Sequence, residues 1–262
     1  MSNNNNEMKK ELGMGAAMAT VVGCVIGSGV FFKPTAIYTA TGGAPGLAII
    51  AWVVTSLVCL CAAMTFAEIA ILIPETGGMP VYLKKVFGDR VGYLCGWMQT
   101  VVFYPGLVAA LAVAVANQAK LFLGDGMVVP VAIACIIIMV ILNCMGAKVG
   151  GAAQTIFTVA KLIPLVLIMI FGFIKGQGNP IFDPMLGEGL SYGSVLGQLM
   201  IAVLFAFEGW TNVGAIAGEM KNPGKDLPKA IVGGVALIMA VYIIINLASV
   251  SYTHLRAHET RR

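Results

Sequence analysis

The stretch IGSGVFFKP, residues 26–34, decides the fold of this chain. It lies inside an apolar run, residues 12–38, that is long enough to cross a membrane as a helix. The triplet Gly27-Ser28-Gly29 gives the backbone the freedom to leave the helix in the middle of that run. Open backbone inside a membrane is tolerated only where it is buried in protein or lines a wet cavity. The stretch therefore predicts a broken helix beside a binding cavity.

The first amides of the outer half-helix suit an anion. The N–H groups of Ser28, Gly29 and Val30 would lack helical partners, and the helix dipole would favour negative charge beside them. A substrate carboxylate is the expected occupant. The alternative is close helix packing through small residues. We prefer that alternative for the other glycines of the run, Gly13, Gly15 and Gly23.

A second interruption is predicted in the apolar run 193–220, at the stretch FAFEGW, residues 205–210. Glu208 and Gly209 lie near its middle, where an ionisable group costs several kcal/mol unless it faces a cavity or a partner. The alternative is a glycine kink with a protonated, hydrogen-bonded Glu208. Interrupted spans at matching positions of two halves indicate a transporter binding site.

Composition supports an all-α integral membrane protein. The 262 residues are 59% hydrophobic and 11% charged, whereas a soluble domain has about 25% charged residues. Membrane barrels need strands that alternate over about ten residues, and the apolar runs here are continuous over twice that length. Seven spans are expected, near residues 12–38, 44–73, 91–119, 127–145, 152–174, 193–220 and 230–250.

No cofactor, metal or nucleic-acid site is expected. The six cysteines all lie within apolar runs and have no metal-ligand spacing, so we interpret them as reduced packing residues. The basic residues are scattered rather than gathered in a nucleic-acid patch. No catalytic set is present, and both histidines lie in the last twelve residues, so an enzyme is not expected.

The distribution of lysine and arginine predicts the orientation in the cell membrane. With residues 1–11 as a cytoplasmic tail, nine basic residues lie inside and three outside, which satisfies the positive-inside rule. The three outside are Lys33, Lys120 and Lys175. The polar end, residues 251–262, follows the last span without a turn signal and would place arginines outside. We interpret it as a foreign end on a truncated gene, with an ordinary polar tail as the alternative.

Two further residues within spans could face the site. Lys161 lies near the middle of the fifth span, where it cannot easily reach water, so a function in coupling is as well supported as a structural cap. Tyr104 precedes Pro105, which should kink the third span. Helix packing explains Tyr104 alone slightly better than a place in the site. Glu68, in the second span, is expected to be structural.

Six motifs in order resemble one family. They are IGSGVF, ETGGMPVYLKKVFG, GWMQTVVFYP, TVAKLIPL, FAFEGW and GEMKNPGKDLPKAI. Together they resemble the amino acid–polyamine–organocation superfamily, in its L-amino-acid transporter branch, and most closely bacterial serine/threonine exchangers. The resemblance covers about residues 9–250.

The resemblance implies a LeuT-like fold of two five-helix inverted repeats followed by two helices. Residues 12–176 would form the first repeat and residues 193–250 the start of the second, so the chain would be an N-terminal fragment truncated after about seven helices. The loop 119–126 lacks the cysteine through which animal members join a heavy chain, so no such partner is expected. The departure Met79-Pro80-Val81 affects only the detail of a gating loop.

The resemblance also implies the site and the activity. The backbone around Gly27-Ser28-Gly29 would hold the substrate carboxylate, carbonyls near Ile26 and Phe205 the ammonium, and Lys161 would replace a sodium ion. The expected function is sodium-independent exchange of small neutral L-amino acids. Proton-coupled symport and a non-functional fragment are the alternatives. The expected site residues are Ile26, Gly27, Ser28, Gly29, Val30, Tyr104, Phe205, Ala206, Phe207, Glu208 and Gly209, with Lys161 for coupling.

Overall fold

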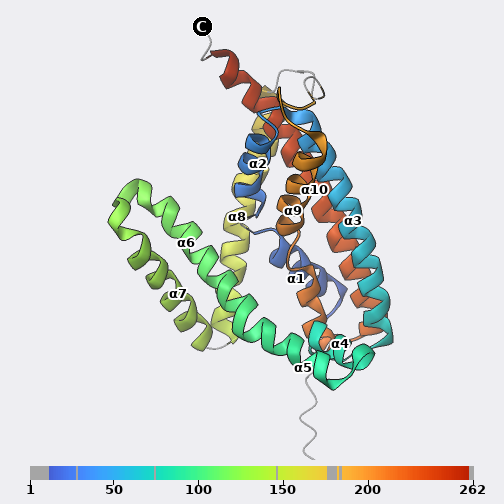
Figure 1. Ribbon diagram of the computed structural model, residues 1–262. Helices are drawn as coiled ribbons and strands as arrows, with labels where there is room; N and C mark the ends of the chain where they lie inside the picture. The colour runs from blue at the N-terminus through green and yellow to red at the C-terminus, as the bar shows by residue number, and fades with distance from the viewer. Residues whose placement is uncertain are drawn as a thin grey trace, which may run out of the picture. The chain divides into compact units, whose positions relative to one another are not determined.

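The computed structural model describes the backbone of residues 12–27, 29–73, 75–145, 147–175, 182 and 185–259 (Figure 1). The expected tail 1–11 and the site residue Ser28 lie outside the described residues. The described chain is helical apart from its turns and one isolated parallel bridge between Leu12 and Met220. An all-α architecture, as predicted, is confirmed.

The chain divides into two compact units. Unit 1 comprises Met1–Tyr82 and Ile163–Arg262, and unit 2 comprises Leu83–Leu162. Unit 1 contains α1 (Met14–Val25), α2 (Gly29–Ala40), α3 (Pro45–Leu72), α9 (Tyr192–Ala206), the 3-10 helix η3 (Trp210–Glu219) and α10 (Pro223–Glu259). Unit 2 contains α5 (Asp89–Met98), the π-helix η1 (Gln99–Phe103), α6 (Tyr104–Leu123), the 3-10 turn η2 (Asp125–Met127) and α7 (Val128–Cys144). Two helices contribute residues to both units, α4 (Met79–Phe87) and α8 (Ala147–Lys175).

Within the described residues, six helical segments are long and apolar enough to cross a membrane. They correspond to the second to seventh predicted spans. The first predicted span is two shorter helices, α1 and α2, because its backbone is interrupted as expected. The last helix, α10, continues through residue 250 to Glu259, so it is longer than the seventh predicted span. The origin of the polar end stays a prediction.

A buried core joins α3 to α10, which lie side by side in unit 1 (Figure 1). Trp52 of α3 and Tyr242 of α10 are fully buried and meet edge to face, with ring centroids 5.5 Å apart. The ring of Phe207, just after α9, meets Tyr242 in the same way at 5.1 Å. Aromatic pairs of this geometry stabilise a core beyond the area that they bury. This core is the support behind both interrupted helices.

Unit 2 contains a π-helical turn where a proline kink was predicted. The amide of Tyr104 donates to the carbonyl of Gln99, five residues back, and Pro105 follows as an early residue of α6. Proline has no N–H for the α-helical ladder, and a wider turn before it absorbs the mismatch. The interruption near Pro105 is therefore a π turn.

Candidate functional site

The first broken helix ends and restarts within a few residues. Helix α1 stops at Val25, and the next residue, Ile26, has left the helix with φ −70° and ψ 84°. Helix α2 restarts at Gly29. The predicted interruption is therefore present, although Gly29 and Val30 already belong to the first turn of α2. Their N–H groups lie among the first four of a helix, which have no partner within that helix.

The second broken helix ends at Ala206. A turn over residues 207–209 follows, and Gly209 adopts φ 116°, a conformation that other residues rarely take. The chain then continues as the 3-10 helix η3. The predicted interruption at Glu208 and Gly209 is confirmed.

The two interruptions pack directly against each other. A methyl group added at Gly29 would lie 2.8 Å from the Cα atom of Ala206, so the two backbones touch there. A methyl group added at Gly209 would lie 3.0 Å from the carbonyl oxygen of Cys24. Gly29 therefore contacts the end of α9, and Gly209 contacts α1 next to its last residue. The two interruptions that sequence analysis paired are thus brought together in unit 1.

Tyr242 joins the open ends of both helices, and sequence analysis missed it. Its hydroxyl lies 3.1 Å from the carbonyl oxygen of Val25, the last residue of α1, and 3.0 Å from that of Ala206, the last residue of α9. The last carbonyls of a helix lack partners within it, and here one phenol O–H serves two of them. A tyrosine in the apolar run 230–250 was the available signal.

The expected site residues of the second break point in different directions. Ala206 and Phe207 are buried, whereas Phe205 and Glu208 are exposed in this chain. The carbonyl of Phe205 accepts a hydrogen bond of 3.2 Å from the amide of Glu208. A carbonyl oxygen has two lone pairs, so this bond leaves the Phe205 oxygen with one lone pair to accept a second hydrogen bond. In the first break, Ile26 and Val30 are buried.

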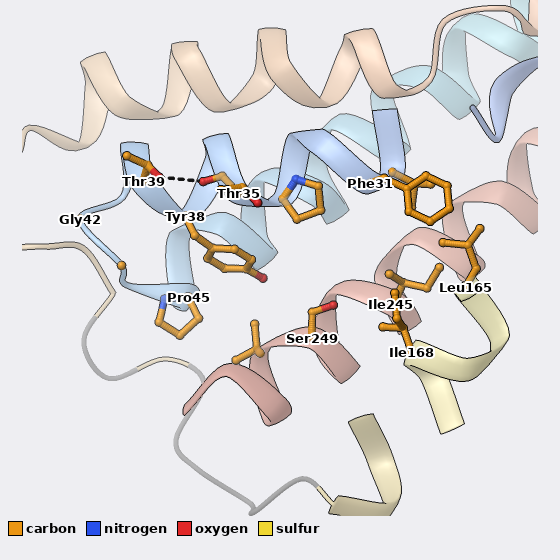
Figure 2. Close-up of a pocket in the computed structure, with 14 residues that line it drawn as sticks. Phe31, Thr35, Tyr38, Thr39, Gly42, Pro45, Leu165, Ile168, Ile245 and Ser249 are labelled. Carbon is orange, nitrogen blue, oxygen red and sulfur yellow. Dashed lines mark hydrogen bonds between the residues drawn. The ribbon is translucent and has the colours of Figure 1, made fainter. Parts of the chain in front are cut away.

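A cavity of about 750 Å³ begins beside Val30 and follows α2 to the turn at Gly42 and Gly43. Figure 2 shows its wall, in which the hydroxyl of Tyr38 points toward Ser249 of α10. The rest of the wall is mostly apolar and includes Leu165 of α8. The cavity therefore reaches the first break from the side of α2 that carries Val30.

The loop after α3 packs on η3, the segment that follows the second break. Tyr82 of α4 is buried against Phe66, with ring centroids 5.3 Å apart, and Phe66 also meets Trp210 of η3 at 5.4 Å. Burial raises the pKa of the Tyr82 phenol above its ordinary value. The loop that carries the motif ETGGMPVYLKKVFG is thus packed on η3 through aromatic rings.

Two expected site residues belong to unit 2. The ring of Tyr104 contacts that of Phe103 edge to face at 5.4 Å. Lys161 is half-buried within α8. Their places at the site stay predictions.

Comparison with known proteins decides the family. The amino acid permease family matches residues 12–253, nearly the whole chain and both broken helices. The chain belongs to the amino acid permease family. This permease is 39% identical over 250 residues to the serine/threonine exchanger SteT of Bacillus subtilis, which covers 95% of the chain and 56% of SteT.

Animal members are also similar to this permease. It is 31% identical to the large neutral amino acids transporter small subunit 2 of Oryctolagus cuniculus, over 93% of the chain and 48% of that protein. It is 31% identical to the human b(0,+)-type amino acid transporter 1, over 92% of the chain and 51% of that protein. The chain spans about half the length of these relatives. The predicted resemblance is confirmed.

Proposed function

We propose that this permease takes part in sodium-independent exchange of small neutral L-amino acids by alternating access. The observation that carries the proposal is the packed pair of broken helices, α1–α2 and α9–η3, in a helical membrane protein. Paired breaks of this kind create polar backbone sites in an apolar setting, and such sites bind substrates in transporters. Its similarity to a serine/threonine exchanger supports small neutral substrates.

The backbone of the breaks would bind the amino-acid part of the substrate. The amides of Gly29 and Val30, the first of α2, would receive the carboxylate together with that of Ser28, which precedes them in sequence, because both the N–H groups and the helix dipole favour an anion. The carbonyls of Ile26 and Phe205 would receive the ammonium group. Backbone groups that bind the zwitterion do not distinguish one substrate side chain from another, so other residues of the site would determine that selectivity.

Lys161 is proposed to replace a coupling ion, and Tyr104 to line the site. A lysine in the middle of a membrane helix is costly unless it serves a function. In the full-length protein, Lys161→Ala should lower exchange far more than the amount of inserted protein. Exchange at the normal rate in that variant would leave Lys161 with a packing role alone.

The decisive experiment compares uptake with and without internal substrate. The full-length protein that contains these residues would be reconstituted in liposomes, and labelled serine followed from outside. If the protein is an exchanger, labelled serine should enter rapidly only those vesicles that are loaded with an unlabelled neutral amino acid. The rate of uptake should be the same with sodium or choline outside. Uptake into empty vesicles driven by a pH gradient would instead support proton-coupled symport. Absence of uptake under all these conditions would refute amino-acid transport.

We propose that the protein lies in the cell membrane with its N-terminus in the cytoplasm. The nine-to-three distribution of basic residues supports this orientation. Single cysteines replacing Lys84 and Lys120, in a background without native cysteines, would report the two sides. A membrane-impermeant thiol reagent added to intact cells should label position 120 and spare position 84. Labelling of position 84 from outside would reverse the orientation.

We also propose that no heavy chain is attached by a disulfide at loop 119–126, which contains no cysteine. Non-reducing electrophoresis of the protein from its native membrane should show no larger band that disappears on reduction.

A further inference from the structure

A lysine lies on the surface where the two outer half-helices meet. The Nζ atom of Lys33, on α2, lies over the ring of Phe205, on α9, at 4.3 Å from the ring centroid. Lys33 is the single charged residue in the sequences of α2 and α9. Because an ammonium group over an aromatic face keeps part of its stabilisation without water, Lys33 can remain charged there.

The position of Lys33 follows from the contact between the two breaks. Lys33 is four residues after Gly29, so both lie on one face of α2, about 6 Å apart along the axis. That face meets α9, since Gly29 touches Ala206 and Lys33 touches Phe205. The cavity beside Val30 lies on another face of α2, and Lys33 is not part of its lining. The ammonium group is therefore one helical turn beyond the break, on the outer side in the proposed orientation.

A carboxylate side chain follows Phe205 in the second break. Glu208 is three residues further along the chain, within the turn of the second break, and its side chain is exposed. In the proposed orientation, a substrate that approaches the breaks from outside along α2 and α9 would pass Lys33 one helical turn before it reaches the turn that carries Glu208. At an effective dielectric constant of about 20 near a protein surface, each charge acts over several ångströms.

We propose that Lys33 is a specificity-determining residue: its ammonium group, held over Phe205, attracts the carboxylate of an entering amino acid and excludes side chains that are cationic. This inference rests on the proposed function, because it assigns the charge preference of the same site. Removing the positive charge leaves α2 and α9 without a charged residue, while Glu208 remains in the turn that follows α9. The site should then lose its preference against cationic amino acids.

The test is a ratio of substrates in the full-length protein. Exchange of labelled serine and of labelled arginine would be measured in the same liposomes for the unaltered protein and for Lys33→Met. The arginine-to-serine ratio of uptake should rise about 15-fold in the variant, the effect of one charge about 10 Å away at an effective dielectric constant of about 20. Lys33→Arg should keep the original ratio. Because a ratio does not depend on the amount of active protein, partial misfolding does not imitate the result.

Two further variants separate charge from packing. Lys120→Met removes a lysine that is paired with Asp125 at 2.7 Å, at the end of α6, and should leave the ratio unchanged. Lys33→Gln keeps a polar side chain without the charge and should raise the arginine-to-serine ratio as Lys33→Met does. This variant gives the same test if Lys33→Met is produced in low yield. A ratio that stays constant in Lys33→Met and Lys33→Gln, while exchange of both substrates falls equally, would overturn the inference and leave Lys33 a packing residue. Absence of exchange by the unaltered protein would overturn the proposed function, and this inference with it.

Discussion

Gly29 and Gly209 set the distance between the two broken helices. We expect Gly29→Ala to separate them, because its new methyl group would lie 2.8 Å from the backbone of Ala206. Gly209→Ala would meet the carbonyl of Cys24 at 3.0 Å and would also have to adopt φ 116°. Each change should cost about 1–3 kcal/mol of folding free energy and most of the exchange activity. Thermal unfolding in detergent and serine exchange would measure both effects.

Gly15→Ala is the matched control for these glycine variants. Gly15 lies in α1, and nothing is within 4 Å of a methyl group added there. Alanine is the better helix former, so this variant should be as stable as the unaltered protein or up to about 1 kcal/mol more stable. Equal stability of Gly29→Ala and Gly15→Ala would contradict the close contact of the breaks.

Tyr242→Phe tests the hydroxyl that joins the two helix ends. The variant keeps the ring contacts with Trp52 and Phe207 but removes the hydrogen bonds to the carbonyls of Val25 and Ala206. Leaving buried carbonyls without this donor should cost about 1–3 kcal/mol and slow exchange. Tyr192→Phe, at an exposed tyrosine that begins α9, should change neither quantity. Unaltered stability and exchange in Tyr242→Phe would show that the two carbonyls find other donors.

Sequence patterns predicted the backbone of the site more fully than its side chains. The triplet Gly27-Ser28-Gly29 and the pair Glu208-Gly209 each lie within an apolar run and mark a helix that must open, so both breaks were predictable from local chemistry. Tyr242 could not be assigned, because its role depends on α10 packing behind both helices, 36 residues from Ala206 and 217 from Val25. In the sequence, a long-range contact of this kind is visible only as one polar side chain within an apolar run.

At the scale of elements, the start of α1 is tied to the end of η3. The amide of Leu12 donates to the carbonyl of Glu219 at 3.0 Å, and the amide of Lys221 donates to the carbonyl of Leu12 at 2.9 Å. These two bonds form the isolated parallel bridge between Leu12 and Met220. The inner halves of the two broken helices are therefore linked at their ends as well as at the breaks.

Leu12→Pro should release this link. Proline has no N–H for the carbonyl of Glu219, so amide hydrogen exchange at residues 219–221 should accelerate, and the melting temperature should fall by a few degrees. Met14→Pro is the control, because residue 14 begins α1, where proline is tolerated. Equal protection of residues 219–221 in the two variants would show that the bridge contributes nothing to this end of η3.

The element pattern also explains where span prediction succeeded and where it needed correction. Six spans followed from length and apolarity alone. The π turn before Pro105 and the extension of α10 to Glu259 did not follow. The first depends on how the helix accommodates a missing N–H. The second depends on residues 251–259, which are compatible with a helix once α10 has nucleated one.

At the scale of the whole molecule, two observations bear on completeness. The chain covers 56% of the serine/threonine exchanger SteT and 51% of the human b(0,+)-type transporter. In the described structure, Phe205 is 43% exposed and Glu208 is exposed, although one lies in the last turn of α9 and the other in the turn after it, both at the break that the proposed site requires. A carboxylate in the middle of a membrane span needs a partner or a cavity, so this face of the second break should be covered in a working transporter.

We therefore predict that the 262-residue chain does not exchange amino acids by itself, whereas the full-length protein that contains it does. Without a cover over Glu208 and Phe205, the open backbone of the breaks would face lipid, where each unsatisfied polar group costs several kcal/mol. Alternating access also requires one bundle to move against another around the site. Both proteins would be reconstituted at equal amounts and followed with labelled serine in vesicles loaded with unlabelled serine. As a control, protease protection would verify that both proteins are inserted in the vesicle membrane. Saturable exchange by the 262-residue chain would show that these residues already form a complete site.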